Sequence, residues 1–279
     1  MSGRLDVRKT YKLFIGGAFP RSESARSYEV TAHNGGFLAN ASRASRKDVR
    51  DAVTAARASW PSWSGLTAYN RGQILYRVAE VMESRRAEFI EQVERAEGEA
   101  SAERQVDGAI DTWVWYAGLT DKLAYIAGGL NPVAGPYFNI TVPESTGVVG
   151  MVAPERPSLA GLVERLAPAL CGGNTVVAIT SQAHPLGAMI AAECFATSDV
   201  PPGVVNLLSG HKDELVPVVA SHLDIDALDV TGVGEGSLAD AERAAAGNVK
   251  RIVRSQGVRS PYEATAFMEL KTVWHPKGA

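Results

Sequence analysis

The amino-acid sequence predicts a doubly wound, Rossmann-type α/β fold, in which a parallel sheet is covered by helices on both faces. Three observations lead to this prediction. In the second half, short apolar runs alternate with helical segments at the spacing of right-handed βαβ units. The first half is mostly helical. The chain then ends in a single strand-like segment, Met268–Pro276.

Capping residues mark the helices of the first half. Ser45 and Asp48 form a capping box at the start of the first helix, and Pro61 is expected to end that helix. Thr67 caps the next helix, which carries an apolar stripe at helical spacing. A longer amphipathic stretch follows over residues 100–126.

A hairpin and the strands of the main sheet come next. The hairpin is expected near residues 130–146, with one strand over 137–142. The predicted strands of the parallel sheet are 147–152, 175–180, 204–208, 227–230 and 249–253. The predicted helices between and after them are 158–170, 185–197, 212–221 and 235–246. Ligands of such sheets bind outside the carboxyl ends of the strands, so the turns there are the first places to look for a site.

Composition excludes several classes of function. The net charge of −3 gives no electrostatic footprint for nucleic acid or an anionic membrane. The basic run Lys250–Arg254 alternates with apolar residues, which favours a half-buried strand over a phosphate-binding patch. No apolar stretch is long enough to span a bilayer, and the first residues lack the apolar core of a signal peptide. Two cysteines suit a reducing compartment, so we expect a cytoplasmic protein.

The turn Thr231–Ser237 is a glycine-rich loop at the carboxyl end of a predicted strand. Glycines there let a backbone approach a pyrophosphate, and the following helix N-terminus favours negative charge. The spacing is not GxGxxG, however, and tight-turn glycines explain the loop about as well. Glu235 and Asp240 would also oppose a bound phosphate. As a nucleotide signature the loop is weak.

The terminal segment Met268–Pro276 raises a question of its own. A lone strand cannot satisfy its backbone hydrogen bonds, so it needs a sheet edge to join. The connector before it, residues 255–266, contains no strand-like run and is too short for a second domain. We therefore expect the segment to be an arm whose receptor lies on another subunit.

Several motifs give the chain a resemblance to the aldehyde dehydrogenase superfamily along nearly its whole length. They are Leu13–Gly17, Gly147–Gly150 before Pro154, Pro168–Leu170 followed by Gly173–Val177, and Pro201–Asn206. The last two are the most specific. The closing residues 269–274 resemble the C-terminal oligomerisation strand of the family. The resemblance implies a coenzyme-binding domain over 1–254, and a connector with an oligomerisation strand over 255–279.

The chain departs from the family at the positions that hold the coenzyme and do the chemistry. Glu155-Arg156 follows Pro154 where the family has Trp-Asn, and Ile179–Gln182 stands where the family has Lys-Pro-Ser-Glu. Val230–Val233 stands where the family has Phe-Thr-Gly-Ser, and Arg254–Gly257 where it has Glu-Leu-Gly-Gly. These changes remove an oxyanion-hole amide, both ribose-holding charges, a hydroxyl and the general base. The resemblance leaves a degenerate coenzyme pocket on Pro154, Ser181, Thr231, Gly232, Gly234 and Gly236. We expect no cofactor, with NAD or NADP binding weakened if it persists.

The resemblance also implies a missing domain. In the family a catalytic domain with a nucleophilic Cys lies before the terminal strand, and here only the connector stands there. Cys171 and Cys194 fall in packed helical contexts, so we expect buried structural thiols. The histidines at 33, 184, 211, 222 and 275 have no metal-ligand spacing. We expect neither a catalytic residue nor a metal site.

Three hypotheses of function follow. In the first, the chain is a non-catalytic structural or regulatory subunit that docks its arm, Met268–Pro276, on a full-length aldehyde dehydrogenase. In the second, it binds NAD(P) and a partner chain supplies the nucleophile. In the third, the altered pocket binds an effector anion through Arg156 and Arg254.

Overall fold

The computed structural model describes residues 8–278, so the first seven residues of the amino-terminal segment examined for a signal peptide lie outside the described part. A five-stranded parallel sheet forms the centre, in the order β10-β9-β6-β7-β8. Its strands are β6 (Val148–Val152), β7 (Thr175–Ile179), β8 (Val205–Leu208), β9 (Ala227–Asp229) and β10 (Arg251–Val253). The chain winds from β6 outward to β8, then returns to β9 on the other side. The predicted doubly wound fold is confirmed.

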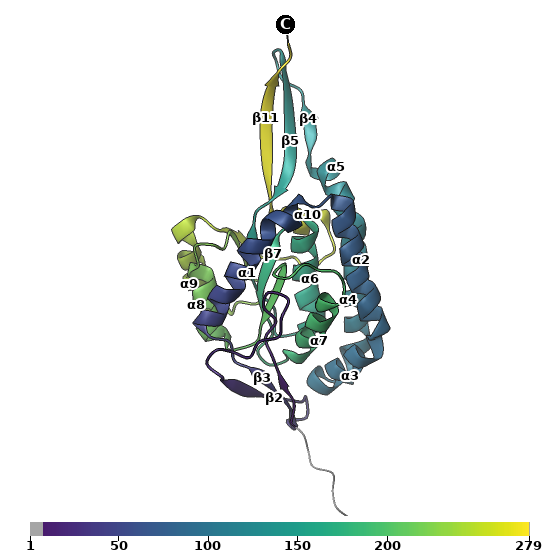
Figure 1. Cartoon of the computed structure of the whole chain (residues 1–279), viewed down its shortest axis with the longest axis vertical. Coiled ribbons are helices and arrows are strands. Elements are labelled where there is room, and N and C mark those ends of the chain that lie inside the picture. The colour runs from purple at the N-terminus through teal and green to yellow at the C-terminus, as the bar shows by residue number, and fades with distance from the viewer. Residues whose placement is uncertain (1–7, 279) are drawn as a thin grey trace, which may run out of the picture.

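Helices cover both faces of this sheet (Figure 1). They are α6 (Ser158–Cys171), α7 (Leu186–Ala196), α8 (Lys212–Ser221) and α9 (Glu235–Ala245). Alternate residues of β6 point to opposite faces, as a strand requires. Val149 and Met151 pack with α6 and α7, whereas Val148 and Val152 pack with α8 and α9. The sheet therefore separates two apolar cores.

The first helix α1 (Arg46–Gly65) has the predicted capping box, in which the Ser45 side chain accepts from the backbone N–H of Asp48. The prediction that Pro61 ends this helix is wrong, because α1 continues for another turn to Gly65. That turn places Trp63 in the core with no exposed surface. Burial of so large a side chain offsets the hydrogen bond that a proline removes.

The remaining N-terminal helices form a layer beyond α6 and α7. They are α2 (Ala68–Ser84), α3 (Arg86–Glu97), α4 (Glu99–Leu119), a 3₁₀ turn (Thr120–Lys122) and α5 (Leu123–Ala127). Thr67 caps α2 as predicted, its hydroxyl accepting from the backbone N–H of Asn70. Gly72 allows α2 to approach α4, since a Cβ there would lie 2.8 Å from the Ala117 carbonyl oxygen. Trp113 is fully buried in this layer.

A small N-terminal sheet was not predicted from the sequence. It consists of β1 (Thr10–Tyr11), β2 (Ser27–Thr31) and β3 (Phe37–Ser42), in the order β1-β3-β2. The basic run at 250–254 also differs from its prediction. Strand β10 begins only at Arg251, because Val249 has a left-handed backbone with φ of 57°. Ile252 is exposed, whereas Val253 and Lys250 are buried, so the run contains a half-buried strand as predicted, shorter than expected and with one apolar side chain facing outward.

The terminal strand β11 (Met268–Pro276) has its partner within the same chain. It pairs antiparallel with β5 (Tyr137–Ser145) along its whole length, from Met268 opposite Ser145 to Pro276 opposite Tyr137. The expectation that it must leave the subunit to find a sheet is therefore wrong. The predicted hairpin is present, because β4 (Gly129–Asn131) pairs with the other edge of β5. Together these three strands form an arm that projects from the body (Figure 1).

The root of the arm is fixed to the main sheet by Asn174. Its side-chain oxygen accepts from the backbone N–H of Gly147, 3.0 Å away, just before β6. Its side-chain nitrogen donates to the carbonyl oxygens of Ala169 and Phe267, at 2.9 and 3.0 Å. One buried amide thus joins the start of the sheet, the end of α6 and the residue before β11. Across the described residues, no helix is long and apolar enough to cross a membrane.

Candidate functional site at the carboxyl edge of the sheet

The six residues predicted to hold a coenzyme all follow strands of the sheet, but they do not form one pocket. Pro154, Ser181 and Thr231 each lie two residues beyond β6, β7 and β9. The loops after β6 and β9 touch at Gly232, whose backbone N–H donates to the Val152 carbonyl oxygen at 2.9 Å. A Cβ at Gly232 would lie 2.1 Å from the Ala153 carbonyl oxygen, so this position requires glycine.

Two cavities open at this edge: one of about 610 Å³ is lined by Glu155, Gln182 and Ala183 together with residues of β2, and the other, of about 440 Å³, lies between α8 and α9. The second cavity contains predicted residues. Its apolar walls come from Val216, Pro217, Val233, Ala241 and Ala244, and its polar lining from Glu155, Lys212, Asp213, Ser237 and Asp240. Gly232 and Gly234 line it, whereas the other four predicted residues do not. A cavity of this size and composition can hold a small ligand.

The hydroxyl and the backbone N–H of Thr231 both form hydrogen bonds within the protein. Its hydroxyl oxygen accepts from the backbone N–H of Ser255 at 3.0 Å, and its own N–H donates to the Asp229 carboxylate at 2.9 Å. Gly234 and Gly236 have open space around the position of a Cβ, so no packing contact with the described residues requires glycine at either position. Pro154 packs against Gly161, where a Cβ would lie 2.4 Å from its ring.

Lys212, the first residue of α8, reaches across this edge, and the sequence analysis did not identify it. Its ammonium lies 2.5 Å from a carboxylate oxygen of Glu155. It also donates to the carbonyl oxygens of Ala153, at 2.6 Å, and Gly232, at 3.2 Å. The lysine thus joins the turns after β6 and β9. The signal in the sequence was a lysine shortly after one strand and a glutamate shortly after another, both at the same edge of a parallel sheet.

Glu155 is the centre of the polar contacts at this edge. Besides Lys212, its carboxylate accepts from the Ser181 hydroxyl at 2.9 Å and from the backbone N–H groups of Gln182 and Ala183, at 3.3 and 3.0 Å. Burial would raise the pKa of Glu155, but the Ala183 N–H and the Lys212 ammonium outweigh burial and hold that pKa below its ordinary value. The carboxylate is therefore charged at neutral pH.

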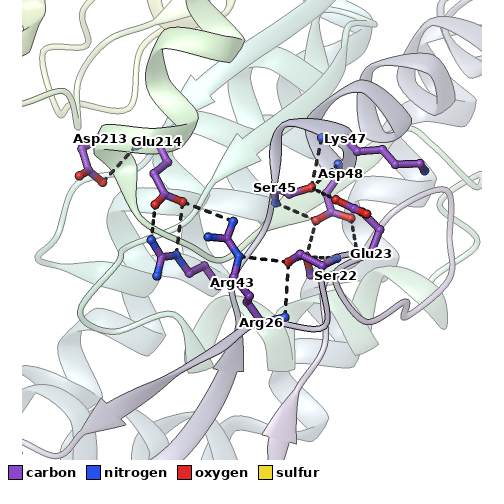
Figure 2. A network of polar contacts seen from close by, with 10 residues as sticks. Ser22, Glu23, Arg26, Arg43, Ser45, Lys47, Asp48, Asp213 and Glu214 are labelled. Atoms are coloured by element: carbon purple, nitrogen blue, oxygen red, sulfur yellow. Dashed lines mark hydrogen bonds and ion pairs between the residues drawn. The ribbon is translucent and has the colours of Figure 1, made fainter.

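The helix that carries Lys212 is fixed in place by its first turn. The side chain of Gln182 accepts from the backbone N–H of Lys212 at 3.0 Å. Glu214 meets the guanidinium of Arg43, with Arg26 3.7 Å from the same carboxylate (Figure 2). The hydrogen bond from Arg43 is the main reason why the pKa of Glu214 is lowered. The N-terminal segment before α1 thus holds the start of α8 against the sheet.

A second group of charged residues lies at the end of β9, on the face of the sheet that α6 covers rather than the face that α8 and α9 cover. Asp229 is fully buried, and one of its carboxylate oxygens has no hydrogen-bond partner among the described residues. Burial raises its pKa. Arg165 on α6 pairs at 3.2 Å with Glu263, which belongs to the short helix α10 (Pro261–Thr265) in the connector. Glu263 also accepts from the backbone N–H of Gln256 at 2.9 Å, so it fixes the connector to the body.

These residues do not fit the pyrophosphate of a dinucleotide. The Gln182 and Ala183 N–H groups, the Ser181 hydroxyl and the ammonium are all engaged by one carboxylate of the protein itself. Asp213 and Asp240 add further negative charge to the cavity lining. An anionic ligand entering in this state would meet three carboxylates and no free donor from this group.

The remaining candidate groups are also engaged or buried. Arg156 donates to the ring of His184 at 3.2 Å and to the Glu97 carbonyl oxygen at 3.4 Å, and no contact within the described residues joins it to Arg254. Both cysteines are buried. Burial raises the pKa of the Cys194 thiol to about 11 and raises that of Cys171 further. Among residues 8–278, no cluster of three or more His, Cys, Asp or Glu is placed to hold a metal ion.

Comparison with known proteins matches residues 19–273 to the aldehyde dehydrogenase family. Human retinal dehydrogenase 2 is 33% identical over 264 residues, which are 92% of this chain and 50% of that protein. Mouse cytosolic 10-formyltetrahydrofolate dehydrogenase is 32% identical over 269 residues, 92% of this chain and 29% of that protein. This chain therefore spans half, or less, of the length of these curated relatives.

Solved structures give the same result. An NAD⁺ complex of aldehyde dehydrogenase from Bacillus cereus is 27% identical with a TM-score of 0.83, covering 88% of this chain and 50% of that one. HpcC from Thermus thermophilus is 29% identical with a TM-score of 0.83, covering 88% of this chain and 48% of that one.

Proposed function

The chain belongs to the aldehyde dehydrogenase family, and on that premise we propose that it is a non-catalytic structural or regulatory subunit of a full-length aldehyde dehydrogenase. It attaches through its three-stranded arm. The observation that carries the proposal is the exposed apolar face of that arm, together with the outer edge of β11.

The apolar face of the arm is formed by Leu130, Phe138, Ile140, Val142 and Val273. Pairing places these side chains together, since Ile140 lies opposite both Leu130 and Val273, and residues two apart on β5 share a face. Each is between 41% and 64% exposed. Apolar residues gathered on a projecting sheet are typical of a protein–protein interface.

The outer edge of β11 supports the same proposal. In the sheet order β11-β5-β4, β11 has a neighbour on one side only among the described residues, which leaves a nine-residue edge for another strand. Addition of a strand from a partner sheet would extend the arm through backbone hydrogen bonds. The family resemblance suggests a catalytic-domain sheet as that partner.

The coenzyme region supports a non-catalytic role. Its polar donors are engaged by Glu155, and both thiols are buried with raised pKa values, whereas a nucleophilic cysteine needs an accessible thiolate. The segment between β10 and β11, where the family resemblance implies a catalytic domain, is a connector tied down by the buried Arg165–Glu263 pair.

The test is co-expression with a full-length aldehyde dehydrogenase from the same source, followed by native mass measurement. We expect a mixed complex with the intact chain. Val273→Glu places a charge on the apolar face and should abolish the complex. Thr272→Glu adds the same charge to the next residue of the strand, on the opposite face, where Leu270 and Trp274 are also exposed, so the pair of variants shows which face of the arm makes the contact. A complex that never forms, or that tolerates both variants equally, would refute the proposal.

A further inference from the structure

Helices α2 and α4 form a groove in the N-terminal helical layer, far along the chain from the loops of the parallel sheet. The groove has a volume of about 310 Å³ and lies between the first half of α2 and the last turns of α4. The start of one helix is thus beside the end of the other, so the two helices run antiparallel. Helix α2 lies at one side of the molecule (Figure 1), where a partner can reach it.

Exposed apolar side chains line this groove. Tyr69 and Tyr76 on α2 are 64% and 49% exposed, and Val114 on α4 is 42% exposed. Gly72 and Gly118 also line the groove and carry no side chain that could fill it, and a Cβ at Gly118 would meet nothing within 4 Å. A groove between two helices can take the apolar stripe of a third helix, and tyrosines are frequent anchors of such contacts.

Acidic residues continue the groove at one end. On α2, Glu80 and Glu83 follow the two tyrosines at helical spacing, and on α4, Glu103 and Asp107 precede Val114 at the same spacing. Because the two helices run antiparallel, these four carboxylates lie beyond the same end of the groove. A helix lying in the groove would therefore meet negative charge at that end.

The helical layer as a whole is also acidic. Two arginines pair with three of the four carboxylates, so the ion pairs do not neutralise all of them. Residues 68–119 include ten acidic and six basic residues, a net charge of −4, whereas the remainder of the chain has a net charge of +1. A second copy of this chain on the same surface would set like charges against each other, which costs free energy. Charge complementarity favours a basic partner.

We propose that the α2–α4 groove binds a basic amphipathic helix of a partner protein. The apolar stripe of that helix lies between the tyrosines and Val114, and its Lys or Arg residues lie over the acidic end. The aromatic contacts supply most of the affinity, and the charges set the direction of the helix. The groove is separate from the three-stranded arm, so this interaction is independent of the subunit function proposed above.

Fluorescence anisotropy of a labelled peptide, titrated with the full chain, tests the inference. The probe is a synthetic amphipathic helix of about five turns, with leucines on one face and lysines on the other. The comparison peptide has glutamate in place of each lysine. We expect the lysine peptide to bind at least about tenfold more tightly than the glutamate peptide, and to bind more weakly as the salt concentration rises.

The position of the peptide is tested by variants of the groove. Gly118→Leu adds a side chain where there is open space, so it fills the groove and should weaken binding of the lysine peptide at least about tenfold. Tyr76→Ser removes one apolar wall and should also weaken binding. Tyr262→Ser is the matched control, because it removes an exposed tyrosine from α10, outside the groove, and should leave the affinity unchanged. Circular dichroism of each variant checks the fold.

Glu83→Lys and Glu242→Lys separate local charge from net charge. Both replace an exposed helical glutamate, but Glu242 lies on α9, away from the groove. Only Glu83→Lys should weaken binding of the lysine peptide and strengthen that of the glutamate peptide. Equal effects of the two variants would show a general charge effect and overturn the inference. So would groove variants that fold and bind like the native chain, or a native chain that does not bind the lysine peptide. A dimer of the isolated chain that Gly118→Leu abolishes would assign the groove to a second copy and overturn it as well.

Discussion

Arg165 on α6 and Glu263 on α10 form a buried ion pair, with a guanidinium nitrogen 3.2 Å from a carboxylate oxygen and side chains only 3% and 7% exposed. The pair joins the body of the domain to the connector that leads into the arm. An ion pair in such surroundings has a large desolvation cost, so breaking it leaves a charge without compensation.

Glu263→Ala should therefore destabilise the chain by about 3–5 kcal/mol, measured by urea unfolding. The control is Glu80→Ala, which breaks the exposed pair with Arg77 and should cost less than about 1 kcal/mol. Similar losses in the two variants would show that the buried pair has no special role in stability.

The buried Asp229 predicts a pH dependence of stability. The pKa of Asp229 is higher in the folded state than in the unfolded state. At pH values between these two pKa values, the native state therefore binds more protons than the unfolded state. Its contribution to stability is then greatest below the unfolded pKa of about 3.9 and falls as pH rises through the folded pKa. Asp229→Asn should remove this fall, so the variant should gain stability relative to the native chain between acid and neutral pH. If the free energies of unfolding of the native chain and of Asp229→Asn change with pH in parallel, the prediction is wrong.

Gly232 and Gly234 provide a test of the turn after β9. Gly232→Ala places a Cβ 2.1 Å from the Ala153 carbonyl oxygen. The resulting strain should lower the free energy of unfolding by about 1–3 kcal/mol. Gly234→Ala enters open space at a backbone φ of −63° and should change stability by less than about 0.5 kcal/mol. Thermal unfolding of the two variants measures the difference, and equal melting temperatures would disprove the close approach.

Reactivity with Ellman's reagent tests the environment of the cysteines. Because burial raises both thiol pKa values, that of Cys194 to about 11, the native chain should react much more slowly at pH 8 than a free cysteine. In guanidinium chloride both thiols should react rapidly. A fast phase in the native protein would identify an accessible thiolate and reopen the question of catalysis.

Much of the fold could be predicted because its signals are local. The Ser45–Asp48 capping box and the Thr67 cap lie next to the helices that they start, and the βαβ alternation is visible over short windows. Predictions failed where distant packing outweighed a local rule. Burial of Trp63 carries α1 past Pro61, and β11 finds its partner more than a hundred residues earlier in the chain.

The candidate site could be located only in part. Sequence reasoning directed attention to the carboxyl edge of the sheet, where the Glu155–Lys212 contacts lie, and to the turn at Gly232, where the backbone approach is close. Both inferences follow from strand order and from the position of glycine. It missed the pairing of Glu155 with Lys212, since these residues are brought together by the crossing of separate βα units. It also assigned Ser181 and Thr231 to a ligand, whereas their hydroxyls serve contacts within the protein.

The three-way hydrogen bonding of Asn174 has a mechanical consequence. If the root of the arm were a flexible loop, a force on the end of the arm would only rotate the arm relative to the body. Here the base is anchored, because one side chain joins Gly147, Ala169 and Phe267. A force on the strands outside the body would therefore be passed through these hydrogen bonds to the amino ends of β6 and β7.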